Sequence, residues 1–155
     1  MMSLLLQLPC AIFVTCGFCI IFNVPVKKFP LCIAIGAASW MSYRCFDYLG
    51  LSSVFAVFLS ACIVWLLSNI CARIFKETST MFIIPGILCL VPGSGMYYTM
   101  LHLLHNDMET MVSTATETLM IAGAIAAGLL AMGSVTGVII LFINRLIAIR
   151  KTKKS

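Results

Sequence analysis

The sequence predicts an all-α integral membrane protein with about five transmembrane helices, the fourth of which is interrupted by two Pro-Gly breaks. Of the 155 residues, 62% are hydrophobic and only 10% are charged, whereas a soluble domain carries about 25% charged residues. The mean hydropathy is +1.11, and apolar runs of roughly 20 residues, the length that spans a bilayer, recur along the chain. We therefore expect a single transmembrane domain, residues 1–155, with no room for a soluble catalytic domain.

Five apolar segments account for the predicted spans. They are residues 4–24, 30–48, 51–72, 79–104 and 117–143. The first segment lacks the positively charged start and the small-residue cleavage site of a signal peptide, so we expect it to remain in the membrane. Thr114 and Glu117 have the spacing of a capping box, which predicts that the last helix begins there.

The distribution of charge predicts the orientation. Five spans place the loop at 27–28, the loop at 73–76 and the basic tail at 145–155 on one side, which then holds nine of the ten Lys and Arg residues. Four of the five acidic residues fall on the other side, together with Arg44. Because positive charge accumulates on the cytoplasmic face, we expect a bacterial inner-membrane protein with its N-terminus outside and its C-terminus in the cytoplasm.

The stretch 81–99 combines membrane-like hydrophobicity with residues that disrupt a helix. It holds Pro85-Gly86, Pro92-Gly93 and a further glycine, Gly95. Each proline removes a backbone donor and pushes against the carbonyl one turn back, and each glycine loosens the chain. Broken backbone at membrane depth survives only where protein covers it or where it lines a polar cavity. Transporters place substrate sites at such interruptions, so this stretch is the best pointer to function.

We expect the helix to resume at Ser94 or Gly95, with the Ser94 hydroxyl capping its new N-terminus. The amides of residues 93–96 would then attract an anion, and a carboxylate is the expected ligand. Tyr97 and Tyr98 follow within one turn and can offer hydroxyl groups to a polar substrate. The candidate substrate-binding residues are Pro92, Gly93, Ser94, Gly95, Met96, Tyr97, Tyr98 and Arg44.

Both the break and the arginine have a structural alternative. The break can be interpreted as a proline-kinked helix whose glycines only permit close packing, although two Pro-Gly pairs and Gly95 are more than a kink needs. Arg44 is either a counter-charge for a substrate carboxylate or an interfacial residue that pairs with Asp47 three positions later. The Gly/Ala-rich last span predicts close contact with another helix.

The remaining motifs do not indicate catalysis, a metal or a cofactor. His102, His105, Asp107 and Glu109 have metal-capable side chains without zinc-type spacing, so the polar rim of an outer vestibule is the favoured interpretation. Most of the eight cysteines lie in apolar segments, where a free thiol behaves as a small hydrophobic group. No nucleotide-binding glycine loop is present. The basic clusters flank apolar runs, which indicates membrane topology and not nucleic-acid binding.

The run Ile84-Pro-Gly-Ile-Leu-Cys-Leu-Val-Pro-Gly-Ser-Gly-Met-Tyr, with Asn23-Val-Pro closing the first span, resembles the threonine/serine exporter family. The chain looks like the second membrane half of that family, which many bacteria encode as a separate small protein. The resemblance implies a secondary exporter of threonine, serine or similar small carboxylates, with succinate-type dicarboxylates in related members. It also implies a larger partner that carries the other membrane half.

Three functions from different classes stay open on this basis. The leading one is an exporter subunit that works with a larger partner by alternating access, with a homo-oligomer as the other way to complete the pathway. The second is an assembly subunit that stabilises a partner and transports nothing. The third is an intramembrane enzyme, which is disfavoured because the spans hold no Ser-His pair and no His-Glu-x-x-His motif.

Overall fold

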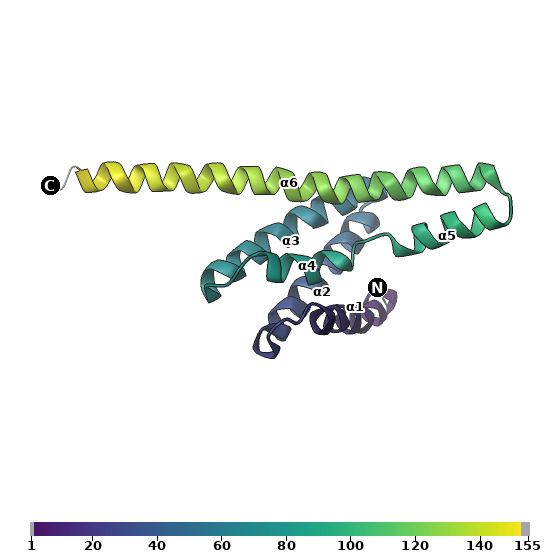
Figure 1. Cartoon of the computed structure of the whole chain (residues 1–155), viewed down its shortest axis with the longest axis horizontal. Helices are drawn as coiled ribbons and strands as arrows, with labels where there is room; N and C mark the ends of the chain where they lie inside the picture. The colour runs from purple at the N-terminus through teal and green to yellow at the C-terminus, as the bar shows by residue number, and fades with distance from the viewer. Residues whose placement is uncertain (1, 153–155) are drawn as a thin grey trace.

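A computed structural model describes the backbone of residues 2–152 and the side chains of residues 7–138. Over that range the chain forms α-helices and one short 3-10 helix and contains no strand, which confirms the all-α fold (Figure 1). The elements in chain order are α1 (Met2–Ile21), η1 (Val26–Lys28), α2 (Phe29–Tyr48), α3 (Ser53–Phe75), α4 (Thr80–Leu88), α5 (Gly93–Leu104) and α6 (Met108–Thr152).

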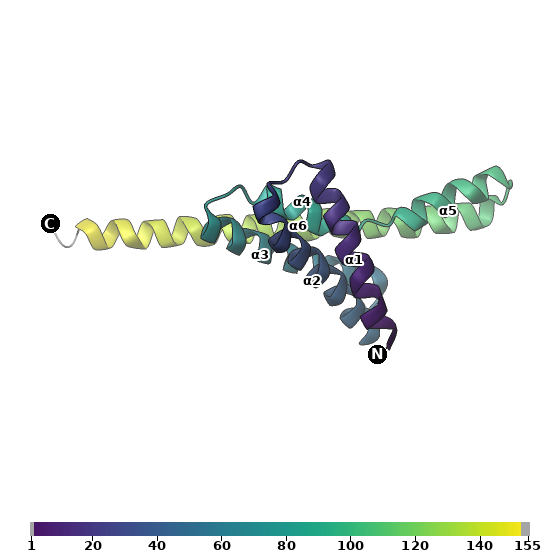
Figure 2. The ribbon, with the colours of Figure 1, turned by 90° about the horizontal axis from the view of Figure 1, so that it is seen from below.

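The helices form two packing units. Helices α1 to α4 pack together as a body, and α6 crosses that body as one long rod (Figures 1 and 2). Helix α3 joins the two, because it packs on both α2 and α6. Helix α5 runs back alongside the first half of α6, and this hairpin projects beyond the body in both views. Among the described helices, α4 contacts α1, α2 and α3, whereas α5 contacts only α6.

The core of the body combines large apolar side chains with small and sulfur-containing ones. Phe82 of α4, Val64 of α3 and Cys32 of α2 are completely buried in one cluster. Helices α1 and α2 approach closely where Gly36 faces Thr15, because a Cβ atom on that glycine would collide with the threonine side chain. Close approach through small residues is how helices associate in a membrane, where no water is expelled between them.

The Gly/Ala-rich part of α6 contacts α3, as the sequence predicted for close helix contact. A Cβ atom on Gly128 would lie 2.9 Å from the carbonyl oxygen of Phe58, so only glycine fits there without a shift of the backbone. Further along the same interface, the indole N–H of Trp65 donates a hydrogen bond of 3.2 Å to the hydroxyl of Thr136. Gly137 lies on the same helix and has open space around it.

The first Pro-Gly pair does not interrupt the fourth segment. Of the two predicted breaks, the one at Pro85-Gly86 was therefore wrong, and the segment is interrupted only before Gly93. Helix α4 runs through Pro85 and Gly86 and ends at Leu88. Proline at position 85 leaves the carbonyl of Met81 without its helical donor, and the Cys32 thiol donates to that oxygen at 3.7 Å. Both Pro85 and Gly86 are buried. Packing against α2 therefore keeps this turn helical.

The last helix begins earlier than the sequence suggested. Helix α6 starts at Met108, and the Thr110 amide donates to the Asp107 carboxylate at 3.2 Å, which makes Asp107 the capping residue. Hydrogen bonds from Thr110, first from its side chain and then from its amide, lower the pKa of Asp107. The predicted start at Thr114 and Glu117 was wrong, because both residues lie inside the helix.

The number of membrane crossings is bounded by helix length and composition. Within the described chain, Ser53–Phe75 and Met108–Val138 are each long and apolar enough to cross a membrane. Helices α4 and α5, bent by 49° at their junction, make a third crossing if they are counted as one broken span. The apolar stretch Gln7–Ile21 of α1 is shorter than these. The count of five spans remains a prediction.

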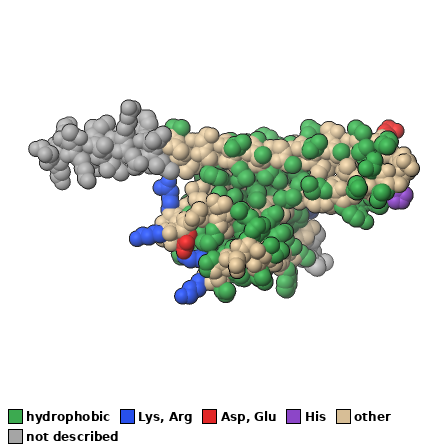
Figure 3. All heavy atoms as spheres, viewed as in Figure 1, with side chains coloured by type: hydrophobic (Ala, Val, Ile, Leu, Met, Phe, Trp, Pro, Cys, Tyr) green, Lys and Arg blue, Asp and Glu red, His purple; other side chains and the backbone are tan. Residues whose placement is uncertain are grey.

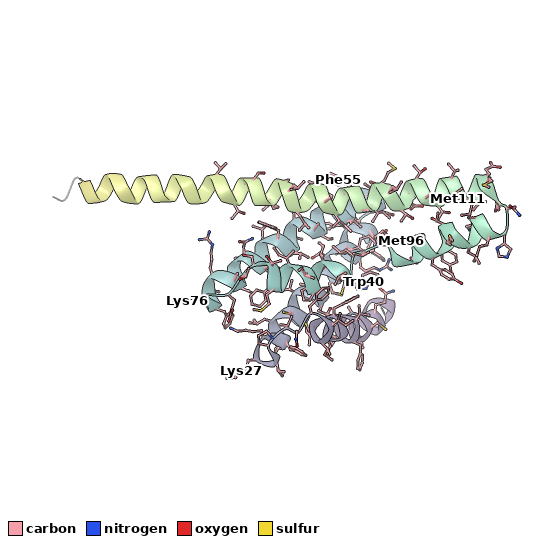
Figure 4. The ribbon with its side chains drawn as sticks, in the orientation of Figure 1. Lys27, Trp40, Phe55, Lys76, Met96 and Met111 are labelled. Carbon is pink, nitrogen blue, oxygen red and sulfur yellow. The ribbon has the colours of Figure 1, made fainter. Side chains whose placement is uncertain are left out.

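The two basic loops meet at one end of the molecule. The Lys28 ammonium lies 3.5 Å from the Glu77 carboxylate and 4.5 Å from the centre of the Phe75 ring. Figure 4 places Lys27 and Lys76 at this end, toward which α6 runs as it approaches its C-terminus. In Figure 3, acidic and histidine side chains gather at the far tip, where α5 meets α6. The side chains of the predicted basic tail, residues 145–155, lie outside the described residues.

The contact between Gly36 and Thr15 makes a stability prediction. We expect Gly36→Ala to lower the free energy of unfolding by about 1–3 kcal/mol, because the added methyl group forces α1 and α2 apart. Thermal unfolding of the purified protein in detergent measures this. Gly17→Ala is the matched control, since a Cβ atom there meets nothing within 4 Å. Equal stability of the two variants would contradict the close contact.

Candidate functional site

The site begins where helix α4 stops. Residues 89–92 are not α-helical, and the chain turns by 49° before α5 begins at Gly93. Short-range hydrogen bonds hold this connection. The amides of Cys89, Leu90 and Val91 donate to carbonyls at the end of α4, and the Gly93 amide donates to the Val91 carbonyl at 2.8 Å. Leu90 is buried against α3 and α6. The connection is thus a defined structure, anchored between the two packing units.

Helix α5 starts with unsatisfied amides. Pro92 occupies the cap position without a side-chain hydrogen bond, and its carbonyl accepts the Met96 amide at 3.2 Å. Because the Gly93 amide is also engaged, the free donors at this end are the amides of Ser94 and Gly95, which bond to nothing in the described chain. The predicted set of four amides is therefore reduced to two. The Ser94 hydroxyl does not cap the helix, since it belongs to the second helical residue.

A cavity of about 460 Å³ opens against this connection. Its walls come from α1, α2, α3, the end of α4, the connection, the start of α5 and α6. They are Val14, Phe18, Trp40, Tyr43, Val57, Leu88, Cys89, Leu90, Val91, Pro92, Gly93, Ser94 and Ile121. Figure 4 shows Trp40 beside the α4–α5 connection. Three of the predicted substrate-binding residues, Pro92, Gly93 and Ser94, thus lie together in one cavity with the end of the broken helix.

The other predicted residues of α5 lie elsewhere. Gly95 faces Thr118 of α6 so closely that a Cβ atom would collide with the threonine side chain. This glycine therefore serves helix packing, which is what the kinked-helix alternative expected of it. Met96, Tyr97 and Tyr98 do not line the cavity and are 62%, 63% and 51% exposed within this chain.

Arg44 forms a local ion pair. One guanidinium nitrogen lies 2.8 Å from the Asp47 carboxylate, in the i, i+3 arrangement that the interfacial interpretation expected. The arginine does not line the cavity.

The structure adds residues that the sequence did not single out. Trp40 and Tyr43, three positions apart on α2, present their rings to the cavity, with centroids 5.5 Å apart. Thr15 of α1 is completely buried, and its hydroxyl lies 3.1 Å from the Cys89 thiol of the connection. The Trp40 indole donates to the Gln7 amide oxygen at 3.3 Å. The available signal was Gln7 and Thr15, polar residues within the apolar first span.

The histidines and acids at the α5–α6 turn form a small polar rim. His102 lies 3.6 Å from the Asp107 carboxylate, and the His105 ring bonds the Leu101 carbonyl at 2.9 Å. Within the described residues, no three His, Cys, Asp or Glu side chains gather as a metal site would require. None of the eight cysteines, all within the described residues, forms a disulfide bond.

Comparison with known proteins assigns the family. Residues 7–135 match the family described as Threonine/Serine exporter, ThrE. The chain belongs to this family. An uncharacterized protein of Haemophilus influenzae is 27% identical over 137 residues, a match that covers 83% of this chain and 46% of the relative. The chain thus spans about half the length of that relative. No solved structure matches.

In this exporter-family chain, the contact of Gly95 with Thr118 can be tested by a double-mutant cycle. We expect Gly95→Ala to destabilise the α5–α6 hairpin by about 1–3 kcal/mol. Thr118→Ala should recover part of that loss in the double variant, because it removes the hydroxyl and methyl that the new Cβ would meet.

Thermal unfolding in detergent measures each variant of this cycle. Gly93→Ala is the control at the same helix end, since a Cβ atom there has open space. Additive effects of the two substitutions would show that the residues do not touch.

Proposed function

We propose that this chain is a membrane subunit of a secondary exporter of threonine, serine or similar small carboxylates, with the substrate carboxylate bound at the start of α5. The observation that carries the proposal is the broken helix, with free amides at Ser94 and Gly95 and a cavity of about 460 Å³ lined by Ser94. Amides at a helix N-terminus carry partial positive charge and bind carboxylates. Transporters use broken helices in this way near the middle of the bilayer.

The packing supports alternating access as the mechanism. The connection at 89–92 joins α4, which packs on the body, to α5, which packs only on α6 among the described helices. A rocking motion of the hairpin against the body would bend the chain at this connection and change the walls of the cavity. Rigid-body rocking about a fixed site is the usual form of alternating access.

A larger partner would complete the pathway. The cavity is bordered by only one broken helix, whereas transporters of this kind enclose their substrate between two membrane halves. The Haemophilus influenzae relative is longer, with 54% of its length outside the match, which fits a family in which this half works together with more protein. We place the complex in a bacterial inner membrane, with the basic loops in the cytoplasm.

The direct test is export of labelled threonine, serine and succinate from cells that express this chain alone and then with its genomic neighbour. We expect export of threonine and serine only with the neighbour, because one broken helix cannot enclose a cavity. Export by this chain alone would indicate a homo-oligomer. Export of succinate without threonine or serine would assign the dicarboxylate branch, and export of none would contradict the proposal.

An assembly subunit that transports nothing is the competing function, and variants of the cavity separate it from the exporter. Gly93→Leu places a side chain in open space at the cavity, so we expect at least a tenfold loss of export while the complex still assembles. Ser94→Ala removes a cavity-lining hydroxyl and should cost less.

The cavity variants are compared by export and by co-purification of the neighbour. Gly17→Leu is the control, because Gly17 also has open space around it but lies outside the cavity. Loss of export only in step with loss of assembly would favour the assembly function. The family is one of transporters, which is why transport and not catalysis is proposed.

A further inference from the structure

A second, smaller cavity adjoins the cavity at the broken helix. Its volume is about 160 Å³, and Gln7, Cys10, Ala11, Val14, Trp40 and Cys89 line it. Three of these residues, Val14, Trp40 and Cys89, also line the larger cavity. The two spaces are therefore neighbours with a common wall, which consists of one side chain each from α1, α2 and the α4–α5 connection. The larger cavity, which Gly93 and Ser94 at the start of α5 also line, extends to this wall.

The smaller cavity is apolar because its polar neighbours bond to one another. The Trp40 indole N–H donates to the Gln7 side-chain oxygen at 3.3 Å. Thr15 donates its hydroxyl proton to the Ala11 carbonyl at 2.8 Å, so the Cys89 thiol, 3.1 Å away, is left as the donor to the threonine oxygen. An apolar group can enter without breaking any of these bonds. A charged group would lose its hydration there and gain no charged partner.

The volume of this space matches a small apolar group, and the space is open where Cys10 and Val14 are exposed. An apolar cavity of about 150 Å³ in a protein interior accepts a molecule as large as benzene. The side chains of threonine, 2-aminobutyrate and valine all fit within this volume, whereas the hydroxymethyl group of serine leaves most of the space unfilled. A ligand that leaves apolar space empty loses the van der Waals contacts that an added methyl group would make there.

We propose that the smaller cavity is the subsite for the side chain of the exported amino acid and that it selects short aliphatic side chains. The inference rests on the proposed function, because it places the carboxylate at the start of α5. It adds a substrate class: threonine over serine, with 2-aminobutyrate and valine as ligands although valine lacks the hydroxyl. Trp40 and Val14, which belong to both cavities, then determine how far a side chain reaches.

The first test is competition for labelled threonine transport in vesicles that contain this chain and its genomic neighbour. We expect 2-aminobutyrate to compete at least as well as threonine, because the polar groups that the smaller cavity borders already bond to one another and do not compensate a buried hydroxyl. Glycine should compete at least tenfold more weakly than 2-aminobutyrate, since one or two carbon groups in an apolar pocket change recognition by roughly that factor. Glycine and 2-aminobutyrate competing equally would overturn the subsite. So would competition by serine alone, because it would show recognition of the hydroxyl and not of the carbon chain.

Substitutions in the wall provide a second test. Cys10 lines only the smaller cavity, so Cys10→Leu fills that space and should lower the ratio of threonine to serine transport about tenfold. Cys45→Leu is the matched control, an identical change at an exposed cysteine of α2 outside both cavities. Val14→Ala enlarges the space and should make leucine a competitor. This gain of recognition cannot result from misfolding.

The outcomes separate the subsite from the exporter function. If the unaltered protein transports threonine but neither variant changes selectivity, the subsite is wrong and the exporter function stands. The subsite is also wrong if Cys10→Leu lowers threonine and serine transport equally, which is the result expected if a lipid chain occupies the space. If the unaltered protein transports no amino acid with its neighbour, the exporter function fails, and the subsite fails with it.

Discussion

The constraint on which this structure depends is that hydrogen-bonding groups of a broken backbone cannot be left facing lipid. At the α4–α5 connection most of these groups are satisfied locally, because the amides of Leu90 and Val91 turn back onto the end of α4. Thr15 of α1 lies within hydrogen-bonding distance of the Cys89 thiol, so the connection is also tied to the body.

The amides of Ser94 and Gly95 make no such local hydrogen bond in the described chain. The cavity at the break lies beside Ser94. Helices of the body and α6 line this cavity: the body supplies Trp40 and Tyr43, and α6 supplies Ile121. Ser94 itself is exposed within this chain. Free amides are costly inside a membrane unless a ligand or further protein covers them.

The two Pro-Gly pairs show how packing decides the effect of the same local sequence. Pro85 deprives the Met81 carbonyl of its donor, but the Cys32 thiol of α2 replaces it, and the helix continues. Pro92 stands where α4 has already ended and becomes the cap of a new helix. Pro85 is thus accommodated inside a helix where a neighbouring thiol replaces its missing donor, whereas Pro92 follows the break and begins the next helix.

The sequence by itself determined the class of the protein. Apolar runs can satisfy their backbone only within a helix, so hydropathy alone predicts an all-α membrane protein. The exporter-family resemblance was likewise carried by one local run, and it is confirmed over residues 7–135. Local chemistry also predicted the pairing of Arg44 with Asp47, because residues three apart on a helix are neighbours whatever surrounds them.

The tertiary structure alone decided which residues meet. Gly95 belongs to the same run as Ser94, yet it packs against Thr118 because α5 turns that face toward α6. Trp40 and Thr15 are far from the break in sequence and reach it only because α1 and α2 pack beside α4. A sequence records spacing along each helix, but the faces that helices turn toward one another depend on all of their contacts at once, and those contacts form the site.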